Sequence, residues 1–554
     1  MITSAVVSKN GNPYLVVNGE KIGSLAYLTY IPEKGGFDNF ARAGYRLYST
    51  CVFFGTNKLN EFSGLDVPCK GIFDAEMPDF SCFDNDIRQI LTTCPDALIF
   101  PRVNVSLSEK WEQEHPDELC YEGCSLHPER KRACMASDVW AQEVKRQLTL
   151  FIGHVESSDF RDHIIGYQVA GGNTEEWFAY NTKGGIGKAT EEKFARLVEQ
   201  GRDDTEESYY HYLSQVTASR VCEFASHIKE LTQRRLVVGS FYGYTLEMQR
   251  RGGTHHALGD MLRCPDIDFI CSPFSYAQTR AAGRDHAYML PVHSLKLHGK
   301  LYFTENDTRT HLSVPINDNP HYNRPLWFGP DREGSLEILK MHFSKGFVYG
   351  HAAWWFDLWG GWYDDPAYMA FMEKVRNISL EQSVADSVVQ VAVLCDELAP
   401  AALEDSDKGL KEVFYDSREA LGKTGVPYHI YLTSDFDEIK DRYQAFVLLE
   451  PRSTKDSEMI KASGVQVLTV TPENSQISSS ELRKFYKNSG VHLYSREDMV
   501  VYANEGYLFI HTVNDGKQHI SVPDDPQLWD MFADSIFAAD FESPAGKSYL
   551  LKKL

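Results

Sequence analysis

The sequence predicts an α/β protein: a (β/α)8 TIM barrel, then a flavodoxin-like α/β domain, then a small C-terminal antiparallel β-domain. Three observations predict it. Eight apolar runs alternate with helical segments up to about residue 360, a shorter alternation of the same kind begins near Ser383, and a period of two replaces it near the end. The 554 residues are 43% hydrophobic and 24% charged, the balance of a packed globular chain.

The first region contains eight apolar runs rich in β-branched and aromatic residues, which predict buried strands. Helical-period segments separate most of them, and the clearest are Asp138–Ile152, Glu206–Leu231 and Ser335–Lys345. Eight such units favour a closed barrel over a doubly wound open sheet. We therefore expect residues 1–383 to form a catalytic barrel. The predicted strands are 22–30, 45–54, 96–104, 163–171, 235–244, 268–276, 300–307 and 347–358.

Two smaller domains are predicted beyond the barrel. Residues 384–495 carry four apolar runs with helical segments between them and no Gly-rich phosphate loop, so no nucleotide site is expected. Residues 496–554 alternate apolar and polar side chains, which predicts a β-sandwich-like domain. The Asn514-Asp515-Gly516 turn predicts a hairpin between the runs on either side of it.

The charge and the cysteines limit the function classes. A net charge of −22 argues against a nucleic-acid partner, and no apolar window is long enough for a membrane-spanning helix. The first residues lack a basic stretch followed by an apolar one, so we expect a cytoplasmic protein unless a leader precedes this sequence. Eleven scattered cysteines indicate reduced thiols. Cys120, Cys124 and Cys134, with His127 between them, do not match a standard zinc spacing, so ordinary loop cysteines are favoured.

Two carboxylates stand where a barrel enzyme places its chemistry, at the carboxyl ends of the strands. Glu305 ends predicted strand 7 after the run KLYFT and is the expected nucleophile; the alternative is a structural pair with Arg309. Glu175 and Glu176 follow strand 4. We favour Glu176 as acid/base because the adjacent Trp177 would desolvate it and raise its pKa. Retaining glycosidases need such a pair about 5–5.5 Å apart.

Further residues are expected to position a sugar. An aromatic content of 12% suits a sugar-binding floor, although a bulky core would have the same composition. His255 and His256 are expected to form a solvated loop pair. The predicted substrate-binding residues are Arg102, Asn104, Asn173, Glu175, Tyr242, Tyr276, Trp354 and Trp355.

Short stretches resemble a known family. IIGYQV in strand 4, FTEND in strand 7 and RVNVSLSEKWEQEHPDE at 102–118 are similar to stretches of the family 42 β-galactosidases of glycoside hydrolase clan A. The three-part plan also looks like the family 164 β-mannosidases. Clan A enzymes usually place Asn directly before the acid/base Glu, whereas the corresponding positions here are Gly171-Gly172. The resemblance implies a homotrimer, in which the α/β domain packs between neighbouring barrels and helps wall off the active site.

These observations favour a retaining exo-β-glycosidase that acts on terminal β-D-galactosides or β-D-mannosides and needs no metal or other cofactor. Its partner would be a small carbohydrate substrate. The alternative is a non-catalytic carbohydrate-binding protein on a diverged barrel, which the displaced acid motivates. A barrel lyase or aldolase would need a lysine at a strand's carboxyl end, and Lys300 stands at the start of strand 7.

Overall fold

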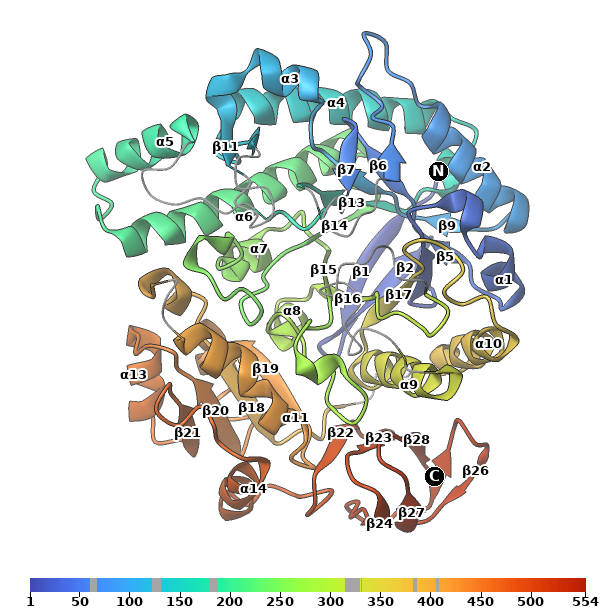
Figure 1. The fold of residues 1–554 in the computed structure, drawn as a ribbon, viewed down its shortest axis with the longest axis vertical. Helices are drawn as coiled ribbons and strands as arrows, with labels where there is room; N and C mark the ends of the chain where they lie inside the picture. Colours follow the sequence, from blue (N-terminus) through green and yellow to red (C-terminus); the bar gives the residue numbers. More distant parts are fainter. Residues whose placement is uncertain are drawn as a thin grey trace.

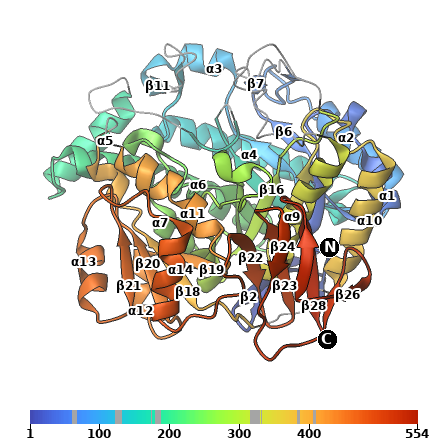
Figure 2. The same ribbon diagram turned by 60° about the horizontal axis from the view of Figure 1, so that its bottom comes forward.

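The computed structural model describes residues 1–59, 67–121, 131–172, 174–178, 187–313, 329, 331–381, 386–404 and 408–554. The barrel, coloured blue to yellow, makes up most of the molecule (Figure 1). The orange α/β domain and the red C-terminal β-domain lie side by side along one edge of it in both views (Figure 1 and Figure 2).

The barrel sheet is parallel and closes on itself. Its strand order is β6-β10-β13-β14-β15-β16-β17-β4-β5-β9. Only Ser49–Thr50 separate β5 from β6, and only Phe100–Pro101 separate β9 from β10, so each pair is one interrupted strand. The ring therefore contains eight strands, one in each predicted run, and the open-sheet alternative is wrong. The strands are β4 (Leu25–Leu28), β5 (Leu47–Tyr48), β6 (Cys51–Phe53), β9 (Leu98–Ile99), β10 (Arg102–Asn104), β13 (Gly166–Ala170), β14 (Val237–Phe241), β15 (Phe269–Pro273), β16 (Leu301–Asn306) and β17 (Ala352–Phe356).

The predicted helices are present, and each begins at a polar cap. Ser137, Thr205 and Asp331 accept backbone N–H groups at the starts of α4, α6 and α9, which satisfies donors that a helix end leaves open. The barrel helices are α1 (Phe37–Arg42), α2 (Ser81–Thr93), α3 (Glu109–Glu114), α4 (Asp138–Ser157), α5 (Lys188–Glu199), α6 (Glu206–Leu231), α7 (Leu258–Arg263), α8 (Val292–Leu297), α9 (Arg332–Tyr349) and α10 (Pro366–Leu380). No helix among the described residues is long and apolar enough to cross a membrane.

An N-terminal antiparallel sheet, which the sequence analysis did not predict, covers the amino end of the barrel. It consists of β1 (Ser4–Lys9), β2 (Asn12–Val17) and β3 (Glu20–Lys21). The Ser4 backbone N donates to the Arg235 carbonyl at 2.8 Å, and the Val237 N donates to the Ser4 hydroxyl at 2.9 Å. These contacts tie the sheet to the start of β14, opposite the end where a barrel carries its chemistry.

The α/β domain has a parallel sheet of order β19-β18-β20-β21, as expected. Its edge strand β19 faces α8 of the barrel. The Ile430 N donates to His293 Nδ1 at 3.0 Å, and the Leu432 N donates to the Ser294 hydroxyl at 2.8 Å, so the strand edge is covered. The elements are β18 (Val391–Cys395), α11 (Arg418–Gly422), β19 (Tyr428–Leu432), α12 (Phe436–Ile439), β20 (Ala445–Leu449), α13 (Lys455–Ala462), β21 (Val467–Val470) and α14 (Ser479–Asn488).

The C-terminal domain is antiparallel, but the predicted hairpin is wrong. The strands on either side of Asn514-Asp515-Gly516 do not pair: β23 pairs with β22 and β28, and β24 pairs with β27. The hairpin lies instead between β22 and β23, where the Asn504 side chain accepts the N–H groups of Gly506 and Tyr507 and forms the turn. The strands are β22 (Met499–Ala503), β23 (Tyr507–Thr512), β24 (Gly516–His519), β25 (Leu528–Asp530), β26 (Ser535–Phe537), β27 (Asp540–Ser543) and β28 (Ser548–Lys553).

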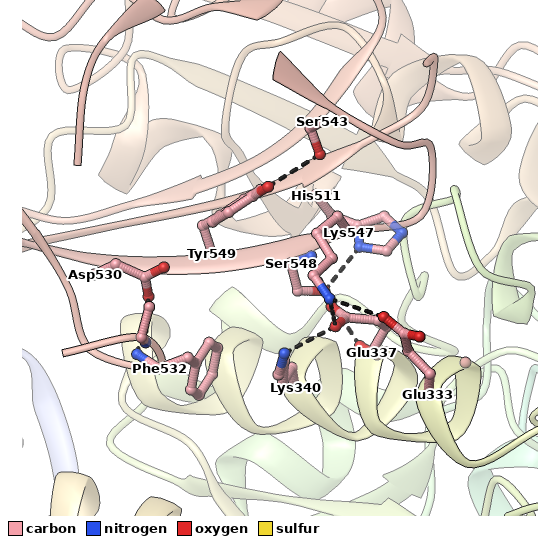
Figure 3. Close-up of polar contacts among 12 residues, drawn as sticks. Glu333, Glu337, Lys340, His511, Asp530, Phe532, Ser543, Lys547, Ser548 and Tyr549 are labelled. Atoms are coloured by element: carbon pink, nitrogen blue, oxygen red, sulfur yellow. Dashed lines mark hydrogen bonds and ion pairs between the residues drawn. The ribbon is translucent and has the colours of Figure 1, made fainter. Parts of the chain in front are cut away.

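Polar contacts with α9 hold this domain on the barrel (Figure 3). Glu337 of α9 accepts the Ser548 N at 2.8 Å and pairs with Lys547 at 2.9 Å and with Lys340 at 2.8 Å. His511 hydrogen-bonds the Ser548 hydroxyl at 2.9 Å. The start of β28 is thus fixed to one face of the helix.

One buried carboxylate joins all three parts of the chain. Asp285 of the barrel pairs with Lys345 of α9 at 2.6 Å and accepts the hydroxyls of Tyr502 at 2.6 Å and Tyr428 at 3.1 Å. Tyr428 comes from the α/β domain and Tyr502 from the β-domain. The Asp285 and Lys345 side chains are only 1% and 3% exposed, so neither charge has water as an alternative partner.

We expect Lys345→Met to lower the free energy of unfolding by about 3–5 kcal/mol, because it leaves the Asp285 charge buried without a cation. Urea unfolding would measure the loss. The matched control is Lys411→Met, since the Lys411–Asp416 pair is exposed at both ends and should be worth less than about 1 kcal/mol. Equal effects of the two substitutions would contradict the assigned role of Asp285.

Candidate active site

A cavity of about 290 Å³ lies at the carboxyl end of the barrel strands. Its walls come from segments that follow five neighbouring strands, β13 to β17. The lining residues are Thr174, Glu176, Phe178, Tyr244, Glu247, Tyr276, Arg280, Met289, Asp307, Arg309, Leu358, Trp359 and Trp362. This is the end at which barrels carry their functional residues.

Arg102 of β10 lies at the centre of the site and is 1% exposed. Its guanidinium donates to Glu305 at 2.7 Å, to Glu175 at 3.1 Å and to Gln168 at 3.0 Å. It also lies over the rings of Phe241, Trp354 and Phe356, at 4.8 to 5.3 Å from their centroids. One buried cation therefore orients two carboxylates.

Glu305 lies on β16 opposite Trp354 of β17 in the strand register. The Trp354 indole donates to the same oxygen that Arg102 contacts, at 3.1 Å. Burial raises the pKa of Glu305 to about 7, and the Arg102 charge acts in the opposite direction and limits this rise. The anionic form is thus held by a cation and an N–H donor, an environment that suits a nucleophile.

The neighbouring acids Glu175 and Glu176 point in different directions because the turn after β13 has an unusual backbone. Glu175 and Trp177 both have left-handed conformations, with φ values of 67° and 63°. Gly171 is required here, since a Cβ would lie 2.6 Å from the Trp177 ring. Glu175 consequently points into the interior, where the Tyr30 hydroxyl donates to it at 2.7 Å. Glu176 lines the cavity.

Glu176 is protonated more readily than an ordinary carboxyl. Burial, followed by the nearby charge of Glu305, raises its pKa to about 8. The Tyr244 hydroxyl donates to it at 2.9 Å and partly opposes this rise. A carboxyl that holds its proton near neutral pH can serve as a general acid.

A histidine supports the backbone of Glu176. His255 Nε2 lies 2.8 Å from the Glu176 carbonyl, and burial lowers the His255 pKa to about 3, so the ring is neutral and this nitrogen carries the proton. The Thr254 hydroxyl donates to the Trp177 carbonyl at 3.3 Å. His255 and His256 are 0% and 1% exposed, so the expectation of a solvated pair is wrong.

Among the predicted substrate-binding residues that the structure describes, Tyr276 alone lines the cavity. Its hydroxyl donates to Asp307 at 2.6 Å. Asn104 donates to the Gly172 carbonyl at 3.2 Å and supports the turn from behind. Tyr242 donates to the Ser214 carbonyl at 2.8 Å and is fully buried.

The two tryptophans of β17 have different places because adjacent strand residues face opposite ways. Trp354 is buried beneath Glu305, whereas the Trp355 indole donates to the Tyr45 hydroxyl at 2.9 Å and packs beside Phe371 of α10, outside the barrel. Trp355 is therefore not brought to the cavity. Asn173 lies outside the described residues.

Several residues of the site had no role predicted from the sequence. Tyr30 and Tyr244 supply hydroxyls to the two adjacent acids, and Asp307 pairs with Arg280 at 2.9 Å. Asp307 follows Glu305 by two residues, and strand alternation was a signal that it faces the same side. Glu247 lies in a turn and Arg280 in the single 3-10 turn Gln278–Arg280, and both elements are too short for a periodic pattern that would indicate orientation.

The cysteine group near residue 127 and Lys300 do not form a second functional site among the described residues. The Cys134 thiol hydrogen-bonds the Thr190 hydroxyl at 2.8 Å, while Cys124 and His127 lie outside the described residues. Within the described part of the chain, no three His, Cys, Asp or Glu side chains are placed to hold a metal ion. Lys300 donates to the Cys264 and Ile267 carbonyls at 2.7 Å, at the amino end of β16, away from the cavity.

Comparisons with solved structures match this architecture over the whole chain. A β-galactosidase from Bacillus circulans sp. alkalophilus has a TM-score of 0.64 at 12% identity, with 96% of this chain and 99% of that chain covered. Gan42B, a GH42 β-galactosidase from G. stearothermophilus, has a TM-score of 0.62 at 9% identity, with 100% of both chains covered. An exo-carrageenase GH42 from Bacteroides ovatus has a TM-score of 0.59 at 12% identity, with 99% and 84% covered. No protein-family model and no curated protein matches the sequence.

The fold is therefore that of a clan A glycoside hydrolase. Within that class, the order of the three parts is barrel, parallel sheet and antiparallel sheet, which is the GH42-like plan. It is shared over nearly the full length of this chain and of each of the two β-galactosidase chains.

We expect Arg102→Met to destabilise the protein by about 3–5 kcal/mol near neutral pH, because two buried carboxyls lose their cation. Those groups are then neutral when folded but ionised when unfolded above about pH 4.5, so the loss should grow as the pH rises. Urea unfolding at about pH 5 and pH 8 would measure this slope.

The matched control is Arg146→Met, since Arg146 forms an exposed pair with Glu143. It should change stability little at either pH. A loss for Arg102→Met that does not depend on pH would contradict the charge role of Arg102.

Proposed function

We propose that the protein is a retaining exo-β-glycosidase, with Glu305 as nucleophile and Glu176 as acid/base. The observation that carries the proposal is the difference in contacts between the two carboxyls: Arg102 and Trp354 donate to Glu305, and the Tyr244 hydroxyl donates to Glu176. Burial and a neighbouring charge keep a proton on Glu176, while Arg102 and Trp354 stabilise the anion of Glu305.

The proposed reaction has two displacements. Glu305 attacks the anomeric carbon while Glu176 gives its proton to the leaving oxygen, and a glycosyl ester forms on Glu305. Glu176, now ionised, then removes a proton from water, which attacks the same carbon and releases the sugar with its configuration retained. Tyr244 stabilises the ionised Glu176 of the second step through its hydroxyl. Arg102 and Tyr30 hold the Glu175 side chain in the interior, so the next residue, Glu176, faces the cavity.

The proposed substrate is a terminal β-D-galactoside or β-D-mannoside. The similarity to solved β-galactosidases supports a β-D-galactoside. The three-part domain plan, which resembles that of the family 164 β-mannosidases, supports a β-D-mannoside. A cavity of about 290 Å³ suits a terminal residue rather than a long chain, and Trp359 and Trp362 give it aromatic walls. From the family resemblance we also propose a homotrimer that acts on small carbohydrates. The net charge of −22 and the absence of a long apolar window support the proposal of no nucleic-acid or membrane partner.

A second candidate is a carbohydrate-binding protein without activity. It is favoured by one observation: the residue before Glu176 is Glu175, buried against Arg102, where clan A enzymes usually carry an Asn. A binding protein would retain affinity for the sugar but release no aglycone.

We expect the wild type to hydrolyse a nitrophenyl β-galactoside or β-mannoside and Glu305→Gln to lose measurable turnover, because the amide cannot attack the anomeric carbon. Glu176→Gln should slow poor leaving groups by about 10²–10⁴-fold and dinitrophenyl substrates much less, since those phenolates need no proton. Absorbance assays and the configuration of the first product by NMR would measure both.

Three results would overturn the proposal: cleavage of α-linked substrates only, inversion of configuration, or full activity of Glu305→Gln. Binding of the sugar by wild type with no turnover of any β-glycoside would establish the binding protein instead.

We expect the alkaline limb of the wild-type kcat/KM profile to lie near pH 8, and Tyr244→Phe to move it upward by about one pH unit. The hydroxyl favours the ionised form of Glu176, so removing it raises the pKa, and activity requires the protonated form. Tyr242→Phe is the matched control because its hydroxyl contacts Ser214 and not the cavity. A downward movement, or the same movement in both variants, would refute the assignment of Glu176.

A further inference from the structure

A guanidinium from the α/β domain reaches the wall of the barrel cavity. Arg418 begins α11, and its side chain is 2% exposed. It donates to the Tyr288 carbonyl at 2.5 Å, to the Ser275 hydroxyl at 3.0 Å and to the Glu247 carboxylate at 3.0 Å. All three partners belong to the barrel, so a charge from one domain is buried in the other.

Glu247 is a carboxylate of the cavity wall with remaining capacity to accept hydrogen bonds. One of its oxygens receives Ser275 at 2.6 Å and Arg418, and the other receives only the Tyr276 backbone N at 3.0 Å among the described contacts. An ionised carboxylate offers about four lone-pair sites. Its side chain is 11% exposed and lines the cavity.

The position of Glu247 is tied to the groups already placed in the reaction. It occupies a single turn after β14 in which the Glu247 N donates to the Tyr244 carbonyl at 3.0 Å. Tyr244 is the residue whose hydroxyl contacts Glu176. Glu247 also accepts the backbone N–H of Tyr276, whose side chain reaches Asp307, the residue that follows β16. Glu247 is therefore connected through Tyr244 to Glu176, and it lines the same cavity as Glu176.

We propose that Glu247 is a substrate-binding residue that accepts hydroxyl groups of the sugar, and that Arg418 is the positioning residue that fixes it. The inference rests on the proposed glycosidase function and narrows the substrate class. A carboxylate acceptor forms strong hydrogen bonds with an uncharged polyol. It repels a sulfate or carboxylate substituent at the same place, so we expect unsubstituted hydroxyls where the sugar contacts Glu247. The cations of Arg280 and Arg309 line other parts of the same cavity.

The competing explanation is that Glu247 only neutralises a buried arginine. A double-mutant cycle separates the two. Glu247→Gln and Arg418→Met each leave one charge without its partner, and the double variant restores neutrality. If Glu247 only neutralises Arg418, both stability and kinetics recover in the double variant. If Glu247 binds substrate, stability recovers but KM does not.

The experiment uses the nitrophenyl glycoside that the wild type cleaves fastest. We expect Glu247→Gln to raise KM by about 10- to 100-fold with a smaller change in kcat. The double variant should keep that KM while its urea midpoint returns toward wild type, and Arg418→Lys should recover part of the affinity that Arg418→Met loses. The alkaline limb of the kcat/KM profile should stay in place, since Glu176 is unchanged.

Lys411→Met is the control in the same domain, where the pair with Asp416 is exposed. A wild-type KM in Glu247→Gln or in the double variant would overturn this inference while leaving the glycosidase proposal intact. Failure of the wild type to cleave any nitrophenyl glycoside would instead remove the proposed function, and this inference with it.

Discussion

The buried guanidinium of Arg102 is the constraint on which the site depends. A cation that is 1% exposed must be compensated within the protein, and Glu175, Glu305 and Gln168 provide that compensation from two other strands and the turn after β13. Because Glu175 is committed to Arg102, the next residue is the one left at the cavity surface. The left-handed backbone at Glu175 and Trp177 is strained, and it turns two adjacent carboxyls in different directions. Glu175 then supports the structure, and Glu176 is available for chemistry.

Much of the fold followed from periodicity, because a parallel strand buried on both faces is a continuous apolar run and a barrel repeats it eight times. Glu305 could be placed for the same reason: it directly ends such a run. The hairpin at Asn514 was wrong because turn chemistry is local, whereas the partner of β24 is the distant strand β27. The burial of His255 had no local signal either, since its partner Glu176 lies 79 residues away.

Among the side chains near the cavity, too, some orientations could be predicted from the local pattern and others depend on distant contacts. Alternation along β17 could have separated Trp354 from Trp355, since one indole must face inward and the other outward. No pattern in the sequence links Arg418 to Glu247, which are 171 residues apart and belong to different domains. Such contacts form where two folded domains pack against each other, so the local sequence around either residue does not predict them.

The carboxylate of Asp285 has a consequence for how the molecule is made. Its partners Lys345, Tyr428 and Tyr502 leave the ribosome in that order. If the barrel closes before the two smaller domains are made, the Asp285–Lys345 pair forms without Tyr428 and Tyr502. Water must then occupy the places of these two side chains. The wall of the barrel next to the two smaller domains therefore reaches its final dry packing only after both of those domains have been made.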